Sequence, residues 1–398
     1  MPYSTKPRVD HAILKKITAV PLLDLHRQYA TIRQEITHAI ERVCASQQFI
    51  LGEEVEALES EIARFTGTSA AVGCASGTDA LWLALTAAGI GSGDAVITTP
   101  FSFFASASAI VRAGARPIFV DADPGTLNLD PANVEARLRS SPNSSIKAIM
   151  PVHLYGQCTD MRALRKISEE FQLPIVEDAA QALGAAWQNK RAGALGLAAA
   201  FSFYPTKNLS AYGEAGMVTT SNSEMAEHMR RLRNHGSSHR YHHEEFGWNA
   251  RMDAIQAAIL RVKLPHLETW NQQRRDRAAT YDRLFAEAGL ISPITSEKTR
   301  VQPLENFKQG VHVFHQYIIR AQRRDELRAF LAQKNIGTEV YYPVPLHVQP
   351  CFAYLGYREG DLPVAERAAK EVLALPLFPE LTEDEQQYVV SNVADFYS

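Results

Sequence analysis

Residues 70–88 read AAVGCASGTDALWLALTAA, and the fold class follows from this stretch. Its first part, Ala70 to Cys74, is a short apolar run ahead of a polar turn, which is typical of a buried strand. Its last part, from Asp79 to Ala88, has the length and apolar content of a helix. Ser76 stands where an N-cap belongs, with Asp79 as its capping-box partner. A strand that leads directly into a helix is the building unit of an α/β fold.

The turn of this unit has a second interpretation. Gly77 lets the backbone approach a ligand closely and Thr78 adds a hydroxyl, so the helix start is also suited to bind a phosphate. Ser and Asp at these positions are equally typical of a plain helix cap. Taken alone, the turn favours the plain cap, with the phosphate site as the alternative.

The same alternation of strands and helices recurs along the chain. Helices are predicted between several of the strands, which favours a largely parallel sheet covered on both faces. Beyond Trp270, a strand over 311–320 and a mixed segment predict a smaller α+β part. We therefore expect an N-terminal extension at 1–20, a large domain at 21–270 and a small domain at 271–398. The predicted strands of the large domain are 70–74, 95–99, 117–120, 148–152, 175–177, 199–203 and 217–220.

Composition excludes several function classes. The 398 residues are 46% hydrophobic, which is typical of a folded globular protein. A net charge of -3 gives no reason to expect nucleic acid as a partner. The four cysteines contain no CxxC pair, so we interpret them as reduced structural thiols. The start of the chain lacks a signal peptide, and the longest apolar interior run is too short to span a bilayer. We therefore expect a cytoplasmic protein that does not enter a membrane.

Two charged residues stand at the ends of predicted strands. Asp178 follows the buried run at 175–177, where a carboxylate needs a positive partner. Lys207 follows the aromatic strand at 199–203 and a turn, a setting that can lower the pKa of an amine and make it nucleophilic. A lysine can form a Schiff base, a carboxylate can pair with a pyridinium nitrogen, and a helix start can hold a phosphate. Together these groups point to one cofactor chemistry.

The motifs of the chain are similar in sequence and in order to those of one family. The similarity extends from about Val20 to the C-terminus. The motifs are FILG (49–52), ASGTDAL (75–81), GDAVI (93–97), PVHLYG (151–156), EDAAQ (177–181), SFYPTK (202–207), GWNARMD (247–253), YP (342–343) and LP (375–376). The chain resembles the DegT/DnrJ/EryC1/StrS sugar aminotransferases, which use pyridoxal phosphate and have fold type I. That fold has a mostly parallel seven-stranded sheet with helices on both faces and a smaller C-terminal α+β domain.

The resemblance implies roles for the residues that carry it. Lys207 would anchor the cofactor and transfer protons, and Asp178 would pair with the ring nitrogen. Gln181 would bind the phenolic oxygen, and Phe103 would stack on the ring. In the family an asparagine at the position of Asn249 reaches the cofactor phosphate from the neighbouring subunit, so a homodimer with shared active sites is implied. The cofactor-binding set is completed by Ser76, Gly77, Thr78 and Ser202.

Other polar residues are candidates for binding the substrate. Arg240 and Tyr241 lie in a histidine-containing loop, which the resemblance places near the partner's active site. It therefore implies a contact for the nucleotide pyrophosphate, with a solvated surface loop as the alternative. The spacing of the histidines does not favour a metal site. His315 is predicted on a strand, where it either faces the sugar or is a buried core histidine. Tyr155 and Tyr342 have the same two interpretations.

The resemblance predicts an aminotransferase that acts on a nucleotide-linked keto sugar with L-glutamate as donor. The later segments favour 3-amination of a dTDP-3-keto-6-deoxyhexose. The alternatives are amination of a UDP-3-keto-N-acetylhexosaminuronate or of a 4-keto sugar nucleotide. A uronate would need an arginine in the pocket, whereas an uncharged deoxysugar would not. A hypothesis of a different class is a non-catalytic regulator that binds pyridoxal phosphate.

Overall fold

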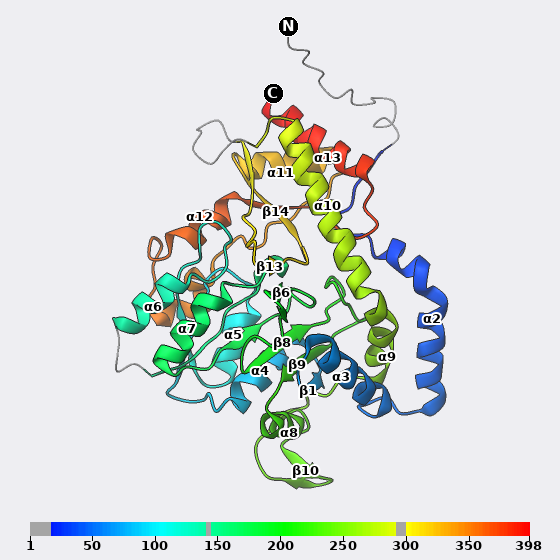
Figure 1. The fold of residues 1–398 in the computed structure, drawn as a ribbon, viewed down its shortest axis with the longest axis vertical. Coiled ribbons are helices and arrows are strands. Elements are labelled where there is room, and N and C mark those ends of the chain that lie inside the picture. Colours follow the sequence, from blue (N-terminus) through cyan, green and yellow to red (C-terminus); the bar gives the residue numbers. More distant parts are fainter. Residues whose placement is uncertain (1–16, 141–144, 292–299) are drawn as a thin grey trace.

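The computed structural model describes residues 17–140, 145–291 and 300–398. Most of the expected N-terminal extension lies outside these residues. A large part with a central sheet forms the lower body in Figure 1, and a smaller part carries both α10 and the C-terminal helix above it. The predicted boundary between them, at 270/271, falls within one continuous helix, α10 (Leu267–Glu287).

Seven strands of the described chain form the sheet of the large part. Two hydrogen-bonded sets, ordered β3-β2-β4 and β5-β8-β9-β1, are joined by parallel bridges from Ile149 to Ile175 and from Val152 to Asp178. Only β9 runs antiparallel to its neighbours. The prediction of a mostly parallel seven-stranded sheet is confirmed. The strands are β1 (Ala70–Cys74), β2 (Ala95–Thr98), β3 (Arg116–Phe119), β4 (Ile146–Ile149), β5 (Val176–Asp178), β8 (Ala198–Ser202) and β9 (Gly216–Thr220).

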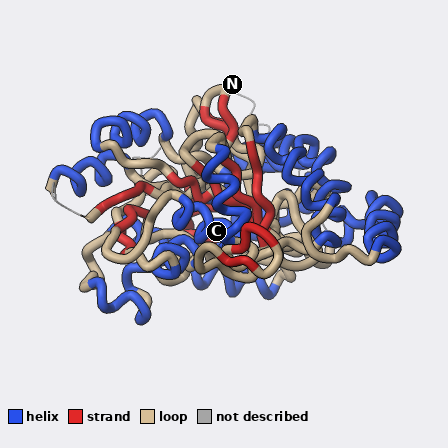
Figure 2. The backbone as a smooth tube through the Cα atoms, turned by 90° about the horizontal axis from the view of Figure 1, so that it is seen from below, coloured by secondary structure: helices blue, strands red, loops and turns tan. Residues whose placement is uncertain are grey.

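Each face of this sheet is covered by its own apolar core. Alternate residues of a strand point to opposite faces, so Val72 and Val96 belong to one core and Ala71 and Ile97 to the other. Figure 2 shows the strands running through the middle with helices to either side. The helices of the large part are α2 (Leu25–Ser46), α3 (Glu53–Thr66), α4 (Gly77–Ala87), α5 (Ala105–Arg112), α6 (Pro131–Arg139), α7 (Met161–Phe171), α8 (Ser223–Leu232) and α9 (Ala254–Lys263).

The small part is an antiparallel sheet with helices packed against it, as predicted. Its strands β12 (Val301–Pro303), β14 (Tyr317–Ala321) and β15 (Val372–Leu375) pair in that order. They share a core with α10 and with residues of the large part such as Phe101 and Val152. The other helices of this part are α11 (Arg324–Gln333), α12 (Pro363–Glu371) and α13 (Glu383–Tyr397). No helix among the described residues is long and apolar enough to cross a membrane.

The strand predicted over 311–320 was wrong in its extent. The structure divides it into β13 (Gly310–Val311), which pairs with β6 (Ala186–Trp187) of the large part, and β14 of the small part. The chain changes sheets between them, and Phe314 adopts a left-handed φ of 43°. His315 consequently lies in a bend rather than on a strand. The remaining short elements are η1 (Leu154–Gly156), β7 (Lys190–Arg191), β10 (Ser237–His239), β11 (His242–His243), η2 (Leu264–His266), η3 (Leu346–Val348) and η4 (Pro350–Leu355).

Candidate active site

Asp178 is the last residue of β5 and is buried at the carboxyl edge of the parallel strands. Its Oδ2 accepts a hydrogen bond of 2.7 Å from Ser106 Oγ, and its Oδ1 accepts one of 3.2 Å from Ala180 N. Burial raises the pKa of this carboxyl, while the bonds from Ser106 and Ala180 and the nearby Lys207 act in the opposite direction. The ionised form of Asp178 therefore depends on the hydrogen-bond donors and positive charges around it.

Ser106 was not recognised in the sequence. Its hydroxyl lies 2.8 Å from Ser102 Oγ, and because its hydrogen is donated to Asp178, Ser102 must be the donor in that pair. Both serines follow β2, whose end lies at the same edge of the sheet as the end of β5. That position, shortly after a strand, is the signal that could have identified them.

Lys207 stands in the turn after β8, close to Asp178. Its backbone N–H donates to Tyr204 O at 2.8 Å, and Ala211 N donates to Phe203 O at 2.8 Å, so the turn is closed at both ends. Burial lowers the pKa of the lysine to about 8, against the opposing charge of Asp178. Roughly a tenth of such an amine is unprotonated at pH 7, far more than for an ordinary lysine. The structure thus brings a nucleophilic amine to a buried carboxylate.

Ser76 is the N-cap of α4, as predicted. Its Oγ accepts from Asp79 N at 3.1 Å, and its hydrogen is donated to Asp79 Oδ2 at 2.8 Å. The capping box is not complete, because the Asp79 carboxylate binds this hydroxyl and Arg112 rather than the backbone N–H of Ser76. The hydroxyl of Ser76 is thus used at the helix start, and its part in binding the cofactor stays a prediction.

Gly77 and Ser202 lie against each other beside this helix start. A Cβ added to Gly77 would be 2.6 Å from Ser202 Cβ, so only glycine leaves the space open. Among the described residues no hydrogen-bond partner lies at the backbone N–H groups of Gly77 and Thr78. Free N–H groups at a helix N-terminus with a hydroxyl beside them are the donors that a phosphate group needs. The residues present therefore fit the phosphate of the expected cofactor.

Gln181 connects two of the predicted tyrosines. Its Oε1 accepts from Tyr155 N at 2.6 Å, and its Nε2 donates to Tyr342 OH at 3.0 Å, which leaves one amide hydrogen free for a ligand. The Tyr155 hydroxyl donates to Tyr341 O, so this buried ring is bonded within the chain rather than directed at a ligand. Phe103, in contrast, is 58% exposed, and its ring centroid lies 6.2 Å from that of Tyr342.

His315 is buried, and its Nδ1 lies 3.2 Å from Oδ1 of Asn208, the residue after Lys207. Burial and the charges of Lys207 and Arg274 lower the pKa of this imidazole well below its usual value, so the ring is neutral. The structure thus places His315 next to the lysine turn. Asn208 was missed in the sequence although it adjoins Lys207.

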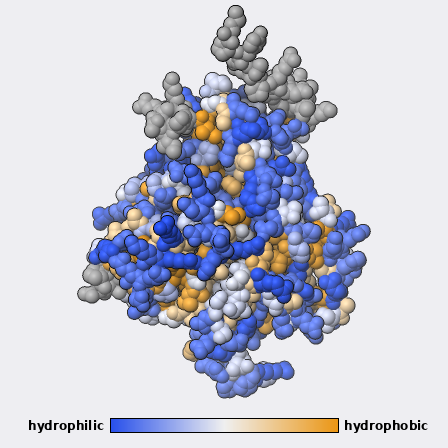
Figure 3. All heavy atoms as spheres, viewed as in Figure 1, coloured by the Kyte–Doolittle hydropathy of each residue, from blue (hydrophilic) through white to orange (hydrophobic). Residues whose placement is uncertain are grey.

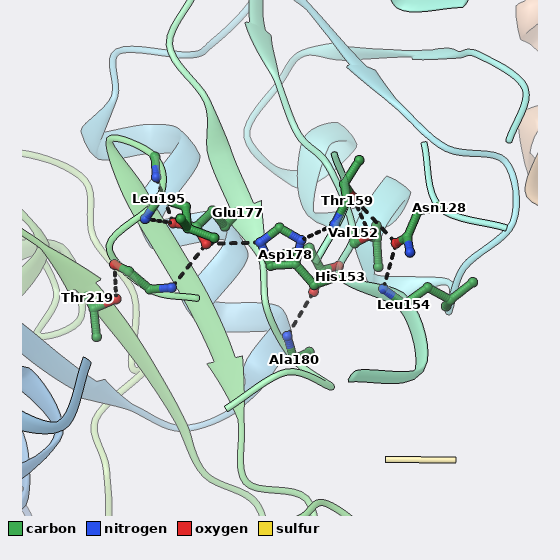
Figure 4. Close-up of polar contacts among 12 residues, drawn as sticks. Asn128, Val152, His153, Leu154, Thr159, Glu177, Asp178, Ala180, Leu195 and Thr219 are labelled. Atoms are coloured by element: carbon green, nitrogen blue, oxygen red, sulfur yellow. Dashed lines mark hydrogen bonds and ion pairs between the residues drawn. The ribbon is translucent and has the colours of Figure 1, made fainter. Parts of the chain in front are cut away.

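A second buried pair, Glu177 and His153, lies next to Asp178, as Figure 4 shows. Glu177 accepts hydrogen bonds from His153 Nε2 at 3.0 Å and from three backbone N–H groups of residues 193, 195 and 196. Thr159 N donates to His153 Nδ1 at 3.2 Å, so Nε2 carries the ring hydrogen and donates it to Glu177. Both side chains are fully buried. They hold the strand end that carries Asp178.

Arg240 and Tyr241 lie on a hairpin of the large part, and Asn249 lies at its base, next to Ala250, whose carbonyl accepts from Ala75 N at 3.0 Å. They belong to the β10–β11 hairpin and its base, which project beyond α8 in Figure 1, while the hairpin surface is hydrophilic in Figure 3. Tyr241 is 83% exposed, and Arg240 Nη2 donates to its hydroxyl at 3.2 Å. Asn249 is exposed where the chain pairs with Asn234 at the base of the hairpin.

Comparison with known proteins agrees with this geometry. The family model of the DegT/DnrJ/EryC1/StrS aminotransferase family matches residues 30–394. The chain belongs to this family. It is accordingly a pyridoxal phosphate-dependent aminotransferase. Lys207, Asp178 and the helix start of α4 are the groups of this family member that fit the cofactor.

Three similar proteins illustrate the range of the family. A pleiotropic regulatory protein of Geobacillus stearothermophilus is 52% identical over 95% of this chain and 98% of its own length. The dTDP-3-amino-3,4,6-trideoxy-alpha-D-glucose transaminase of Streptomyces venezuelae is 43% identical over 95% of this chain and 96% of its own. The crystal structure of S. venezuelae DesV with a ketimine intermediate has a TM-score of 0.90 and 42% identity, and covers 96% of this chain and 99% of DesV.

Proposed function

We propose that this aminotransferase moves an amino group from L-glutamate to the keto carbon of a nucleotide-linked sugar. The observation that carries the proposal is the placement of Lys207 beside the buried Asp178 in a chain of this family. The relative from S. venezuelae is named for a dTDP-linked 3-amino sugar, which supports a dTDP-3-keto-6-deoxyhexose aminated at C3 as the substrate.

The residues of the site would share the work as follows. When bound, pyridoxal phosphate supplies a carbonyl carbon that reacts with amines and a ring that withdraws electrons. Nζ of Lys207 would hold the cofactor and, when free, would transfer a proton to or from the reacting carbon. The carboxylate of Asp178 would pair with the ring nitrogen, and the remaining amide hydrogen of Gln181 would bind the phenolic oxygen. Further contacts come from the ring of Phe103, which stacks, and from a phosphate cradle of Gly77, Thr78 and Ser202.

A homodimer with shared active sites would explain how Arg240, Tyr241 and Asn249 take part in a site although they lie at or near the β10–β11 hairpin. Asn249 is exposed in the single chain, and Phe246 and Trp248 beside it expose large apolar surfaces. A second copy packed on this face would cover them and bring Asn249 to the cofactor phosphate of its partner. Arg240 and Tyr241 would then contact the pyrophosphate of the substrate, while Tyr342 and His315 would belong to the sugar side of the pocket. Tyr155, whose hydroxyl is bonded to Tyr341 O, would act on that side only through Gln181, which accepts from its backbone N–H.

The charge of the pocket favours an uncharged deoxysugar over a uronate. A uronate needs a cation to pair with its carboxylate. The arginines whose charges act on His315 and Tyr155 are both engaged elsewhere. Arg274 donates to three backbone carbonyls, and Arg320 donates to Pro124 O and lies near Glu371. The carboxylate of a UDP-linked uronate would therefore have to pair with Arg240 of the partner subunit. This alternative and a 4-keto sugar nucleotide are both included in the substrate panel below.

A non-catalytic regulator is the competing function, and one relative bears such a name. A regulator that holds pyridoxal phosphate through Lys207 needs a partly neutral amine as well, so the two functions are separated by whether an amine donor turns the bound cofactor over.

The experiment that tests these proposals follows the absorbance of the cofactor-loaded protein. We expect L-glutamate to bleach the band of the lysine-bound cofactor and one keto sugar to restore it. The panel is a dTDP-3-keto-6-deoxyhexose, a UDP-3-keto-N-acetylhexosaminuronate and a 4-keto sugar nucleotide, and NMR of the product identifies the aminated carbon. Lys207→Ala should show no such band, whereas the exposed Lys166→Ala should match wild type. A band that glutamate never bleaches would reject the aminotransferase proposal in favour of the regulator.

A further inference from the structure

Asn271 is a fully buried polar side chain on α10, the helix that runs from the small part down to the large part in Figure 1. Its Nδ2 donates to Leu183 O at 3.2 Å, and its Oδ1 accepts from Asn208 Nδ2 at 2.8 Å. The first contact fixes the orientation of the amide, because a carbonyl can only accept. One side chain of a distant helix thus joins two loops of the large part.

Each of these loops carries residues of the proposed cofactor site. The first loop, residues 179–185, follows Asp178 at the end of β5 and contains Gln181. The second, residues 204–212, follows β8 and contains Lys207. Strands β5 and β8 are parallel neighbours, so both loops leave the same edge of the sheet. Among the residues that the structure describes, no hydrogen bond joins one loop directly to the other, and Asn271 supplies the polar link between them.

The chain around the Asn271 amide is closely packed. Gly184 has a left-handed φ of 91°, and a Cβ added there would be 2.5 Å from Asn271 Nδ2. Only glycine lets the chain approach the amide so closely. Asn208 is also held from its other side, since its Nδ2 donates to Val313 O at 3.0 Å and its Oδ1 lies 3.2 Å from His315 Nδ1. The bridge is therefore fixed at both of its ends.

A purely structural role for Asn271 is the alternative. Buried amides are normally hydrogen-bonded, and removing one leaves its partners unsatisfied wherever it lies in a fold. What distinguishes Asn271 is the place of its two partners. Leu183 and Asn208 belong to the loops that carry Gln181 and Lys207, so the bridge holds these two residues relative to each other.

We propose that Asn271 is a positioning residue for the amino transfer, because its two hydrogen bonds hold the Lys207 turn against the loop that follows Asp178. The inference rests on the proposed function for its effect on the reaction, since a displacement of about 1 Å at a reacting group can lower a rate roughly a hundredfold. The link between the loops is a property of the cofactor-free protein. Its failure there is therefore distinguishable from failure of the aminotransferase proposal.

Two substitutions of Asn271 test the bridge. Asn271→Leu keeps the branched shape but removes both hydrogen bonds. In Asn271→Asp, a protonated carboxyl donates to Leu183 O and accepts from Asn208 as the amide does, whereas a carboxylate cannot donate. Full burial favours the protonated form, so the rescue should be strongest at low pH. The matched control is Asn392→Leu, because Asn392 is also buried and donates to Tyr388 O at 2.8 Å within α13.

The first measurement is amide hydrogen exchange of the cofactor-free proteins, followed by mass spectrometry. We expect Asn271→Leu to speed exchange roughly tenfold in peptides of both loops, while the strands of the sheet keep their wild-type rates. A merely structural loss of stability would speed exchange without preference for these loops, and Asn392→Leu is the reference for that outcome. Unchanged exchange in the two loops, or equal changes throughout the fold, would overturn the proposal.

The second measurement follows the cofactor band of the loaded enzyme during its reaction with L-glutamate. We expect bleaching to be roughly ten- to a hundredfold slower in Asn271→Leu, with the glutamate concentration for half-maximal rate unchanged. Asn392→Leu should react as wild type does. At low pH, Asn271→Asp should approach the rate of wild type at the same pH. An Asp variant that stays slow at every pH would contradict the proposal, and this comparison holds even if the Leu variant does not fold.

Discussion

The Ser106 hydroxyl donates a hydrogen bond of 2.7 Å to Oδ2 of Asp178. Burial raises the pKa of this carboxyl, and the hydrogen bond acts in the opposite direction. Ser106→Ala removes this donor, so the pKa of Asp178 rises further and less of the carboxyl is ionised and able to pair with a positive ring nitrogen. A hydrogen bond to a charged group contributes about 1.5–3 kcal/mol, which corresponds to at least roughly tenfold weaker cofactor binding. Titration of the apoprotein with pyridoxal phosphate measures this affinity. Ser108→Ala, on the same helix, should bind as wild type does, and equal affinity of both variants would remove Ser106 from the site.

The close contact between Gly77 and Ser202 predicts how the cofactor phosphate is bound. In Gly77→Ala, the new Cβ would meet Ser202 Cβ at 2.6 Å and displace the hydroxyl or the helix start. Overpacking of this kind costs about 1–3 kcal/mol, so we expect affinity for pyridoxal phosphate to fall roughly tenfold or more. Affinity for pyridoxal, which lacks the phosphate, should not change. The matched control is Gly91→Ala, where the nearest atom lies 4.0 Å away. An equal loss for both ligands would show general damage instead of a phosphate cradle.

The four donors around Glu177 make its charge important for stability. Glu177→Gln keeps the shape, but at least one amide hydrogen must face His153 Nε2–H or a backbone N–H. A buried clash of donors in place of a carboxylate that accepts four hydrogen bonds costs about 3 kcal/mol. Urea unfolding should show that loss, whereas the exposed Glu169→Gln should unfold like wild type. A Gln variant of unchanged stability would mean that the pair does not hold the end of β5.

The sequence predicted those parts of the structure that depend on local pattern. Periodicity and the parallel sheet predict strand runs such as 70–74, the helix start at Ser76, Asp178 at the end of a strand and Lys207 in the turn after another. What it did not predict depends on contacts between distant segments. Ser106 meets Asp178 across 72 positions, and His315 meets Asn208 across 107. Neither pairing leaves a periodic signal, and the exchange of sheets near Phe314 hid the bend that places His315.

The lowered pKa of Lys207 predicts a reactivity that depends on pH. An amine reacts only when unprotonated, so its labelling by acetic anhydride in the apoprotein should fall as the pH drops through about 8. An ordinary lysine in water has a midpoint near 10.5 and provides the reference. Because Asp178 holds the pKa of Lys207 up, Asp178→Asn should move the midpoint lower still. A Lys207 midpoint near 10.5 in wild type would show that the amine is not shielded from water as the structure describes.

The burial of Lys263, which lies outside the proposed cofactor site, predicts that the stability of the protein depends on pH. Its buried Nζ donates to Ser210 O at 2.8 Å and to Ser210 Oγ at 3.0 Å, close to the Tyr212 ring, and no carboxylate of the described residues pairs with it. Burial lowers its pKa from 10.5 to about 8. Below pH 8 the folded and unfolded states are both protonated, and the folded state carries the full penalty of a buried cation, at most about 3 kcal/mol. Between pH 8 and 10.5 the folded state loses this proton first, so this contribution to the unfolding free energy rises with pH.

Lys263→Met removes the titrating amine. Comparing the variant with wild type therefore isolates the pH-dependent contribution of Lys263 to the unfolding free energy. The loss of the Ser210 bonds shifts stability by an amount that does not depend on pH, whereas the penalty of the cation does. The unfolding free energy of the variant minus that of wild type should thus become more negative from pH 7 to pH 9.5, by about 1–2 kcal/mol. Urea unfolding at both values measures it, with Lys166→Met as a control whose difference should stay flat. A flat difference for Lys263→Met as well would mean that water reaches the ammonium group and that its pKa is ordinary.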